Sequence, residues 1–115
     1  MIKIGVAGLG TVGGEAVRIL KARRGDFIRR LNAEVRVAAV CDRQVGREAR
    51  RLGLGREVRR VQRPLELLRE PLDLVVETLG GAADARALVL EALRSGRHVV
   101  TANKRLLAHH WDELF

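Results

Sequence analysis

The sequence is short of aromatic side chains and of cysteine. Its 115 residues include one Trp, two Phe and no Tyr, so a hydrophobic core has to be built from Leu, Val, Ile and Ala. An aliphatic core of this kind suits strands packed between helices in an α/β protein. Cys41 is the only cysteine. One thiol cannot form an internal disulfide, which is typical of proteins from the reducing cytoplasm.

Long apolar runs are also missing. No stretch approaches the roughly 18 to 20 apolar residues that a membrane-spanning helix needs. Residues 1–6 lack the long apolar region of a signal peptide. We therefore expect a cytoplasmic protein with no membrane partner, and the length allows one domain over residues 1–115.

Acidic residues are outnumbered by basic ones. The chain has 22 Lys and Arg against 14 Asp and Glu, a formal net charge of +8. A basic balance can indicate a nucleic-acid partner. Here the basic residues are spread along the chain, and no aromatic residues alternate with them to stack on bases. We therefore expect no nucleic-acid partner, although a few of these charges suit a polyanionic cofactor.

Hydrophobic patterning predicts alternating strands and helices. Apolar and β-branched runs predict strands at residues 2–7, 35–41, 58–61, 72–79 and 97–101. Helices are predicted over residues 11–31, over a short arginine-rich segment after residue 44, over residues 82–94 and from residue 104 onward. Pro64 is predicted to open a helical turn that Pro71 closes. This alternation predicts a doubly wound, mainly parallel, Rossmann-type α/β sheet in a single domain.

Two of the predicted helices have a readable apolar face. The face of the first is predicted from the helical spacing of Val12, Ala16, Ile19 and Leu20, and is continued by Phe27, Ile28 and Leu31. The face of the helix over residues 82–94 is predicted from Ala85, Leu88, Val89, Ala92 and Leu93. Ser95-Gly96 is expected to end that helix as a glycine cap.

A G-x-G-x-x-G sequence joins the first strand to the first helix. In that position, Gly8 permits a tight turn, Gly10 lets the backbone approach a pyrophosphate, and Gly13 lets the helix pack closely on the sheet. The free N–H groups of the helix N-terminus, which begins with Thr11 and Val12, then face the phosphates. The motif predicts a dinucleotide site, and the competing interpretation is a glycine-rich turn without a ligand.

Asp42 and Arg43 follow the second predicted strand. An acidic residue there accepts hydrogen bonds from the adenosine ribose, whereas a basic residue neutralises the 2′-phosphate of NADP. Asp42 lies about 30 residues after Gly13 instead of the usual 20 or so, which requires a longer first helix or an added loop. Both NAD and NADP therefore remain open as cofactors, and a solvated turn is the alternative interpretation.

The next two strands end in further candidate site residues. Small residues in Thr78-Leu79-Gly80-Gly81 leave room for the ribose on the nicotinamide side of a cofactor, because ligands of open α/β sheets lie at the carboxyl ends of the strands. Lys104 follows the strand at residues 97–101, at the same edge, and suits a contact with the cofactor or with an acidic substrate. Ordinary strand–helix turns would explain both segments equally simply. No cysteine or carboxylate cluster accompanies His98, His109 and His110, so no metal site is expected.

Four segments together resemble the N-terminal domain of homoserine dehydrogenase: residues 8–14, 74–81, 96–104 (Gly-Arg-His-Val-Val-Thr-Ala-Asn-Lys) and 106–115. That family reversibly oxidises L-homoserine to L-aspartate 4-semialdehyde with NAD or NADP, in threonine, methionine and isoleucine biosynthesis. The resemblance implies that residues 8–13 hold the pyrophosphate and that Thr78 and Leu79 line the nicotinamide side. It further implies that Lys104 assists catalysis by orienting cofactor and substrate.

The family also has a second domain, which binds the substrate, forms the dimer and carries the lysine proposed as proton donor and acceptor. The resemblance therefore implies that this chain is a cofactor-binding fragment of a homo-oligomeric enzyme, without turnover of its own. The cofactor domain of another two-domain reductase is one alternative, since the fold and the glycine motif are shared. A nucleotide-sensing module without chemistry is another, and nucleic-acid binding with a steep salt dependence is a third.

Overall fold

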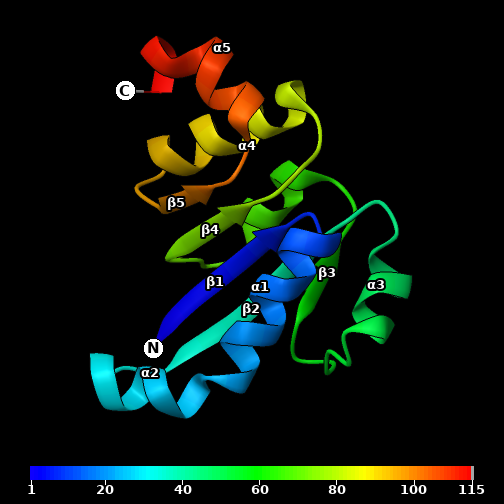
Figure 1. Ribbon diagram of the computed structural model, residues 1–115, viewed down its shortest axis with the longest axis vertical. Coiled ribbons are helices and arrows are strands. Elements are labelled where there is room, and N and C mark those ends of the chain that lie inside the picture. Colours follow the sequence, from blue (N-terminus) through cyan, green and yellow to red (C-terminus); the bar gives the residue numbers. More distant parts are fainter. Residues whose placement is uncertain (115) are drawn as a thin grey trace.

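A sheet of five parallel strands forms the centre of the chain (Figure 1). The computed structural model describes residues 1–114. The strands are β1 (Ile2–Ala7), β2 (Val35–Cys41), β3 (Arg59–Val61), β4 (Leu74–Glu77) and β5 (His98–Thr101), in the order β3-β2-β1-β4-β5. The strand order reverses between β1 and β4, which is the switch point of a doubly wound fold. The predicted fold class is therefore confirmed.

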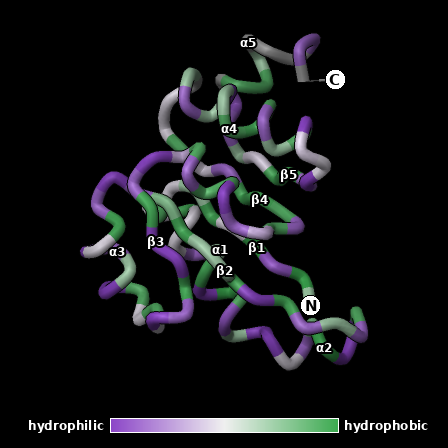
Figure 2. The backbone as a smooth tube through the Cα atoms, turned by 180° about the vertical axis from the view of Figure 1, so that it is seen from behind, coloured by the Kyte–Doolittle hydropathy of each residue, from purple (hydrophilic) through white to green (hydrophobic). Residues whose placement is uncertain are grey.

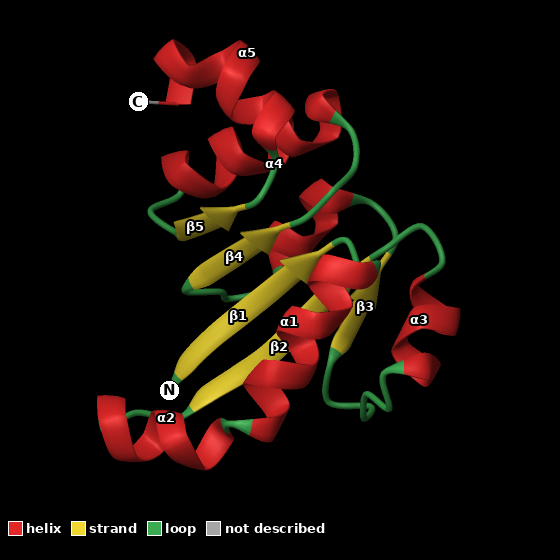
Figure 3. Cartoon of the chain, in the orientation of Figure 1, coloured by secondary structure: helices red, strands yellow, loops and turns green. Residues whose placement is uncertain are grey.

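Helices cover both faces of this sheet (Figure 3). They are α1 (Thr11–Ala22), α2 (Arg24–Leu31), α3 (Val45–Arg51), the 3-10 helix η1 (Pro64–Arg69), α4 (Ala82–Arg94) and α5 (Lys104–Leu114). Neighbouring residues of β1 face opposite layers: Val6 packs with Val17 of α1, whereas Ala7 packs with Leu67 of η1 and Leu88 of α4. The apolar strands are therefore buried on both sides, as parallel strands usually are.

Hydrophobic residues follow the central strands, and the edge at β3 is more polar (Figure 2). β2 is hydrophobic along most of its length, whereas β3 begins with Arg59 and Arg60 and becomes apolar only at Val61. Among the helices of residues 1–114, none combines the length and the apolar character needed to cross a bilayer.

The predicted apolar face of α1 is wrong in part. Val12 is 59% exposed and Ile19 is 46% exposed, while the residues buried against the sheet are Gly13, Gly14 and Val17. A hydrophobic pattern does not count glycines, yet here they form the contact. A Cβ at Gly13 would lie 1.7 Å from the carbonyl oxygen of Gly8, so the helix sits too close to the sheet for any side chain at this position.

The predicted first helix is two helices. α1 ends at Ala22 and α2 begins at Arg24, and only Phe27 of the second helix packs against the core. Ile28 and Leu31 are exposed, so the continued apolar face predicted there is wrong. α2 is the inserted element that accounts for the long separation between the glycine loop and Asp42.

The remaining elements match the predictions with small changes. α4 ends at a glycine in the left-handed region, Gly96 with φ +81°, as the predicted cap requires. β4 is shorter than residues 72–79, and Leu93, predicted to face the core, is 42% exposed. α5 is described as far as Leu114. The side chains of His109, His110 and Trp111, and all of Phe115, lie outside the described residues.

Candidate functional site

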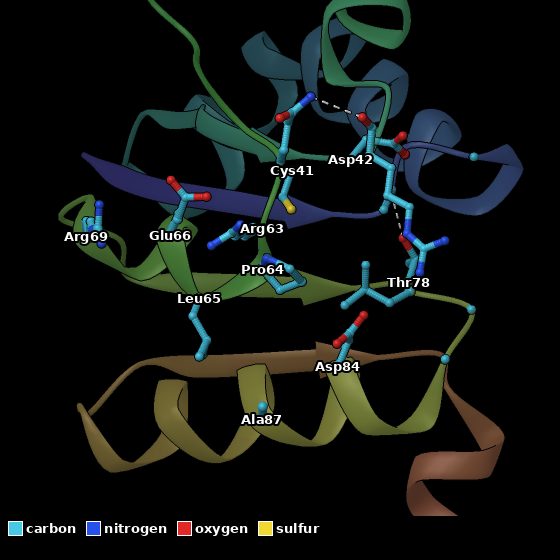
Figure 4. A pocket seen from close by; sticks show the side chains of 17 residues that line it. Cys41, Asp42, Arg63, Pro64, Leu65, Glu66, Arg69, Thr78, Asp84 and Ala87 are labelled. Carbon is cyan, nitrogen blue, oxygen red and sulfur yellow. Dashed lines mark hydrogen bonds between the residues drawn. The ribbon is translucent and has the colours of Figure 1, made fainter.

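An open groove of about 1000 Å³ lies at the carboxyl edge of the sheet (Figure 4). This volume is within the range of small-molecule and cofactor sites. One wall consists of Gly8 and Gly10, and a second of Cys41, Asp42 and Arg43; the other residues are Gln62, Arg63, Pro64, Leu65, Glu66, Arg69, Thr78, Leu79, Gly80, Gly81, Asp84 and Ala87. The groove thus occupies the switch point, where open α/β sheets bind their ligands.

The glycine loop has the geometry that the motif predicts. Gly8 has φ +92°, and a Cβ there would lie 2.6 Å from the carbonyl oxygen of Thr78, so only glycine fits without strain. Gly10 is exposed, and a Cβ there would meet no protein atom within 4 Å. The space beside Gly10 is therefore open to a ligand, while Gly8 and Gly13 are held tightly against the sheet.

The N-terminus of α1 suits a phosphate. Gly10 is its N-cap, no side chain caps the helix, and its first turn holds no acidic residue. The N–H groups of the first turn therefore have no intrahelical acceptor and carry the positive end of the helix dipole. Of the loop, Gly8 and Gly10 line the groove, whereas Thr11, Val12 and Gly13 do not. A contact between these three residues and a cofactor stays a prediction, and it depends on their backbone N–H groups at the helix terminus.

Asp42 holds the glycine loop from the end of β2. Its Oδ2 accepts the N–H of Leu9 at 2.9 Å, and its Oδ1 accepts the N–H of Gln44 at 2.9 Å. A carboxylate oxygen can accept more than one hydrogen bond, so both oxygens keep capacity for a ribose hydroxyl. Arg51 of α3 donates to the carbonyl oxygen of Leu9 at 3.0 Å. The two peptide groups that adjoin Leu9 are therefore both held by side chains. Arg51 was missed by sequence reasoning because nothing distinguishes it within the arginine-rich segment.

Basic residues also line the groove. Arg43, Arg63 and Arg69 all line the groove, and none of them forms an ion pair within residues 1–114. Figure 4 shows Arg63, Pro64 and Glu66 on the segment that follows β3. No sequence motif predicts the part of the groove that Arg63 and Arg69 line. The predicted strand at residues 58–61 was the one signal for these residues, because the carboxyl ends of parallel strands lie at the same edge of the sheet.

The end of β4 forms the opposite side of the groove. The Thr78 hydroxyl donates to the carbonyl oxygens of Gly8 at 2.7 Å and Ala7 at 3.0 Å, which ties β4 to the glycine loop. Leu79 is half-buried, and a Cβ at Gly80 or Gly81 would meet nothing within 4 Å. The structure therefore brings Thr78, Leu79 and Gly80 together with the glycine loop, as the sequence predicts.

Lys104 occupies a separate position. It is the first residue of α5, its side chain is exposed, and it is not among the residues that line the groove. Its contact with a cofactor or substrate stays a prediction. Between Lys104 and the groove lies a set of polar residues that sequence reasoning missed, Glu77, Thr101 and Asn103. Glu77 is fully buried, and the sequence concealed it within a run that predicts a strand.

The buried thiol of Cys41 also faces the groove. Burial raises the pKa of Cys41 to about 12, and the charges of Asp42, Glu66 and Asp84 add to the rise. A thiol with this pKa stays protonated at neutral pH and is a poor nucleophile. Among the side chains that the structure describes, which exclude those of His109 and His110, no group of three or more His, Cys, Asp or Glu is placed to hold a metal ion. The groove thus offers hydrogen-bond donors, a helix dipole and guanidinium groups, which suit a ligand rich in phosphate.

Comparison with known proteins identifies the family of this chain. The family model described as homoserine dehydrogenase, NAD binding domain, matches residues 8–115. The homoserine dehydrogenase of Neisseria gonorrhoeae is 41% identical over 115 residues, which are 99% of this chain and 26% of that protein. That of Bacillus subtilis is 32% identical over 98% of this chain and 26% of its own length.

A solved structure supports the same relationship. The crystal structure of a homoserine dehydrogenase from Thiobacillus denitrificans superimposes with a TM-score of 0.85 at 38% identity, over 99% of this chain and 26% of that chain. The chain thus spans about a quarter of the length of the relatives it matches. The matched residues, 8–115, include every residue that lines the groove and the segment up to Lys104. The chain therefore belongs to the family of homoserine dehydrogenase NAD-binding domains.

Proposed function

We propose that this chain is the cofactor-binding domain, residues 1–115, of a homoserine dehydrogenase that reversibly oxidises L-homoserine to L-aspartate 4-semialdehyde with NAD or NADP. The observation that carries the proposal is the uncapped N-terminus of α1 beside the open space at Gly10, at the switch point of the sheet. The matches to homoserine dehydrogenases over nearly the whole chain favour this function over that of another two-domain reductase.

Each part of the groove has a role in this proposal. Gly8, Gly10 and the first-turn N–H groups of Thr11, Val12 and Gly13 bind the pyrophosphate. Asp42 accepts from the adenosine ribose, and Arg43 is available for a 2′-phosphate. Thr78, Leu79 and Gly80 border the nicotinamide-side ribose. When bound, the dinucleotide takes up or supplies the hydride, and Lys104 orients the nicotinamide end.

The whole enzyme is proposed to be a cytoplasmic homo-oligomer with L-homoserine as its small-molecule substrate. Hydride transfer requires the alcohol carbon to be held against the nicotinamide and a base to take the hydroxyl proton. In the relatives, about three quarters of the length lies outside the part that this chain matches. We therefore expect the 115-residue chain to bind the cofactor and to show no turnover.

Calorimetric titration of the 115-residue chain with NAD and with NADP tests the proposal. We expect saturable binding of at least one dinucleotide, and no formation of reduced cofactor when L-homoserine is added. Absence of binding by both dinucleotides contradicts the proposed cofactor site. Oxidation of homoserine by the chain alone contradicts the proposal that this chain shows no turnover, but does not contradict the proposed cofactor site.

A further inference from the structure

A buried carboxylate joins the ends of β4 and β5. Glu77, the last residue of β4, is fully buried. Its Oε2 accepts the N–H of Leu79 at 2.6 Å, and its Oε1 accepts the hydroxyl of Thr101 at 2.5 Å. Thr101 is the register partner of Glu77 on the neighbouring strand. Carboxylic side chains are rarely buried unless polar groups compensate them, so this residue needs an explanation beyond core packing.

The hydrogen bonds continue from Thr101 into the start of α5. The Thr101 hydroxyl oxygen accepts the N–H of Asn103 at 3.0 Å, and Oδ1 of Asn103 accepts the N–H of Leu106 at 3.0 Å. Asn103 thereby caps α5 and places Lys104 as its first residue. The Asn103 amide nitrogen also donates back to the carbonyl oxygens of Leu79 at 3.2 Å and Gly81 at 3.4 Å.

This network holds the wall of the groove that has few side chains of its own. The N–H of Leu79 is bound by Glu77 and its carbonyl oxygen by Asn103, so both adjoining peptide groups are oriented. Gly80 and Gly81 follow, and glycines have the widest conformational freedom of any residue. The Asn103 bond to Gly81 limits that freedom. The shape of this wall therefore depends on three residues that do not line the groove.

The position of Lys104 at the start of α5 is a second feature that the stability of the fold does not explain. A cation in the first turn of a helix opposes the helix dipole. Lys104 is exposed and has no ion pair within the part of the chain that the structure describes. Its position therefore does not stabilise α5, yet the preceding residue, Asn103, is held in place by four hydrogen bonds.

We propose that Glu77, Thr101 and Asn103 are positioning residues for the nicotinamide half of the bound cofactor. Together they fix the wall at residues 79–81 and set the start of α5, so that the wall and Lys104 keep one arrangement. This inference rests on the proposed cofactor site and extends it. It separates the groove into an adenosine-phosphate half, which the glycine loop and Asp42 organise, and a nicotinamide half that depends on this network.

The test compares NAD with ADP, which has the same adenosine and pyrophosphate but lacks both the nicotinamide-side ribose and the nicotinamide. The affinity ratio of the two ligands measures how well the nicotinamide end is held. Thr101→Val removes the central hydroxyl at nearly constant shape, and Thr101→Ser restores a hydroxyl. Ser95→Ala is the matched control, because the Ser95 hydroxyl, like that of Thr101, both donates and accepts. It donates to the carbonyl oxygens of Glu91 and Ala92 and accepts from Arg97, at the C-terminal end of α4.

We expect Thr101→Val to weaken NAD binding by about tenfold while the affinity for ADP stays within about twofold. Thr101→Ser should recover most of the NAD affinity, and Ser95→Ala should change the affinity for neither ligand. Equal weakening of both ligands, or no change in either, overturns the proposed role of the network. The same holds if the unsubstituted chain binds both ligands equally. Absence of binding by both ligands overturns the proposed cofactor site instead.

Amide hydrogen exchange of the ligand-free chain gives a readout that is independent of affinity. The network predicts that Thr101→Val speeds exchange at the N–H groups of Leu79, Asn103 and Leu106, while the exchange of α1 stays unchanged. Uniform acceleration over the whole chain indicates a general loss of stability, and contradicts a local positioning role.

Discussion

The carboxylate of Asp42 accepts a hydrogen bond from the backbone N–H of Leu9, a residue 33 positions earlier in the chain, at 2.9 Å. The side chain expected to select the adenosine ribose therefore also fixes the loop expected to bind the pyrophosphate. In the next peptide group, Arg51 donates a hydrogen bond to the carbonyl oxygen of Leu9. The glycine loop is thus set by residues from β2 and α3 before any ligand arrives.

Replacing Asp42 should weaken the fold and the site together. Asp42→Ala leaves the part-buried N–H of Leu9 without its acceptor, so we expect the free energy of unfolding to fall by about 1–3 kcal/mol. The affinities for NAD and NADP should both fall, because the loop is no longer fixed. Chemical denaturation and calorimetry measure the two effects. Asp73→Ala is the control, since Asp73 also accepts a backbone N–H, that of Lys3 at 2.8 Å, outside the groove. A loss of cofactor affinity in that variant equal to the loss in Asp42→Ala contradicts the account.

Arg51 should act on the loop without contacting the cofactor. Arg51→Ala removes the bond to Leu9, and we expect NAD and NADP to bind about threefold to tenfold more weakly, by the same factor for each. Arg47 of the same helix is the matched control, since it pairs with Glu48 at 3.5 Å and does not contact the loop. Arg47→Ala should leave both affinities unchanged. A change confined to NADP would mean that Arg51 binds the 2′-phosphate directly.

Arg43 should decide how well NADP competes with NAD. Arg43 lines the groove next to Asp42 and has no ion-pair partner within residues 1–114. We expect Arg43→Ala to weaken NADP binding by about tenfold, since a charged hydrogen bond to a phosphate is lost. The affinity for NAD should stay nearly unchanged. In the unsubstituted chain, raising the salt concentration should reduce NADP affinity more than NAD affinity. Arg50, an exposed residue of α3 outside the groove, is the control. Equal effects of Arg43→Ala on the two cofactors, or the same effects in Arg50→Ala, contradict this role.

The thiol of Cys41 should make the chain less stable in alkali. Its pKa is raised from 9.0 to about 12 by burial and by nearby carboxylates. As the pH rises above 9.0, the unfolded chain releases the thiol proton while the folded chain keeps it, so the free energy of unfolding falls. Between these two pH values we expect the stability advantage of the native chain over Cys41→Ala to shrink, as measured by urea denaturation at several pH values. A constant advantage across that range would show that the thiol is not shielded in the folded state.

Sequence patterns were most informative where backbone geometry requires a particular residue. Gly8, Gly13 and Gly96 were assigned correctly because a positive φ or a close approach admits no side chain there. The sequence predicts β1 and β2 most clearly because these strands are mostly apolar and buried. The same reasoning misplaced the buried face of α1, since Gly13 and Gly14 make its closest contacts without adding any hydrophobicity to the pattern.

Residues that act through long-range hydrogen bonds were the ones that the sequence concealed. Glu77 and Thr101 are far apart in the chain and become partners only because β4 and β5 pair in register. Arg51 reaches Leu9 across the connection between β1 and α1. Such contacts depend on how the strands are ordered, and no local motif contains that information.

The central claim is that the open space beside Gly10 receives the pyrophosphate of a dinucleotide. Gly10→Ala tests it directly, because a Cβ at Gly10 meets no protein atom within 4 Å and the fold should tolerate it. Gly46→Ala is the matched control, since a Cβ at Gly46 also meets no atom within 4 Å and Gly46 lies outside the groove. Calorimetry with NAD and NADP should show Gly10→Ala binding at least about tenfold more weakly than the native chain, with Gly46→Ala unchanged and both variants as stable as the native chain. Native affinity in Gly10→Ala would contradict the account, because the methyl group would then stand where the pyrophosphate has to lie.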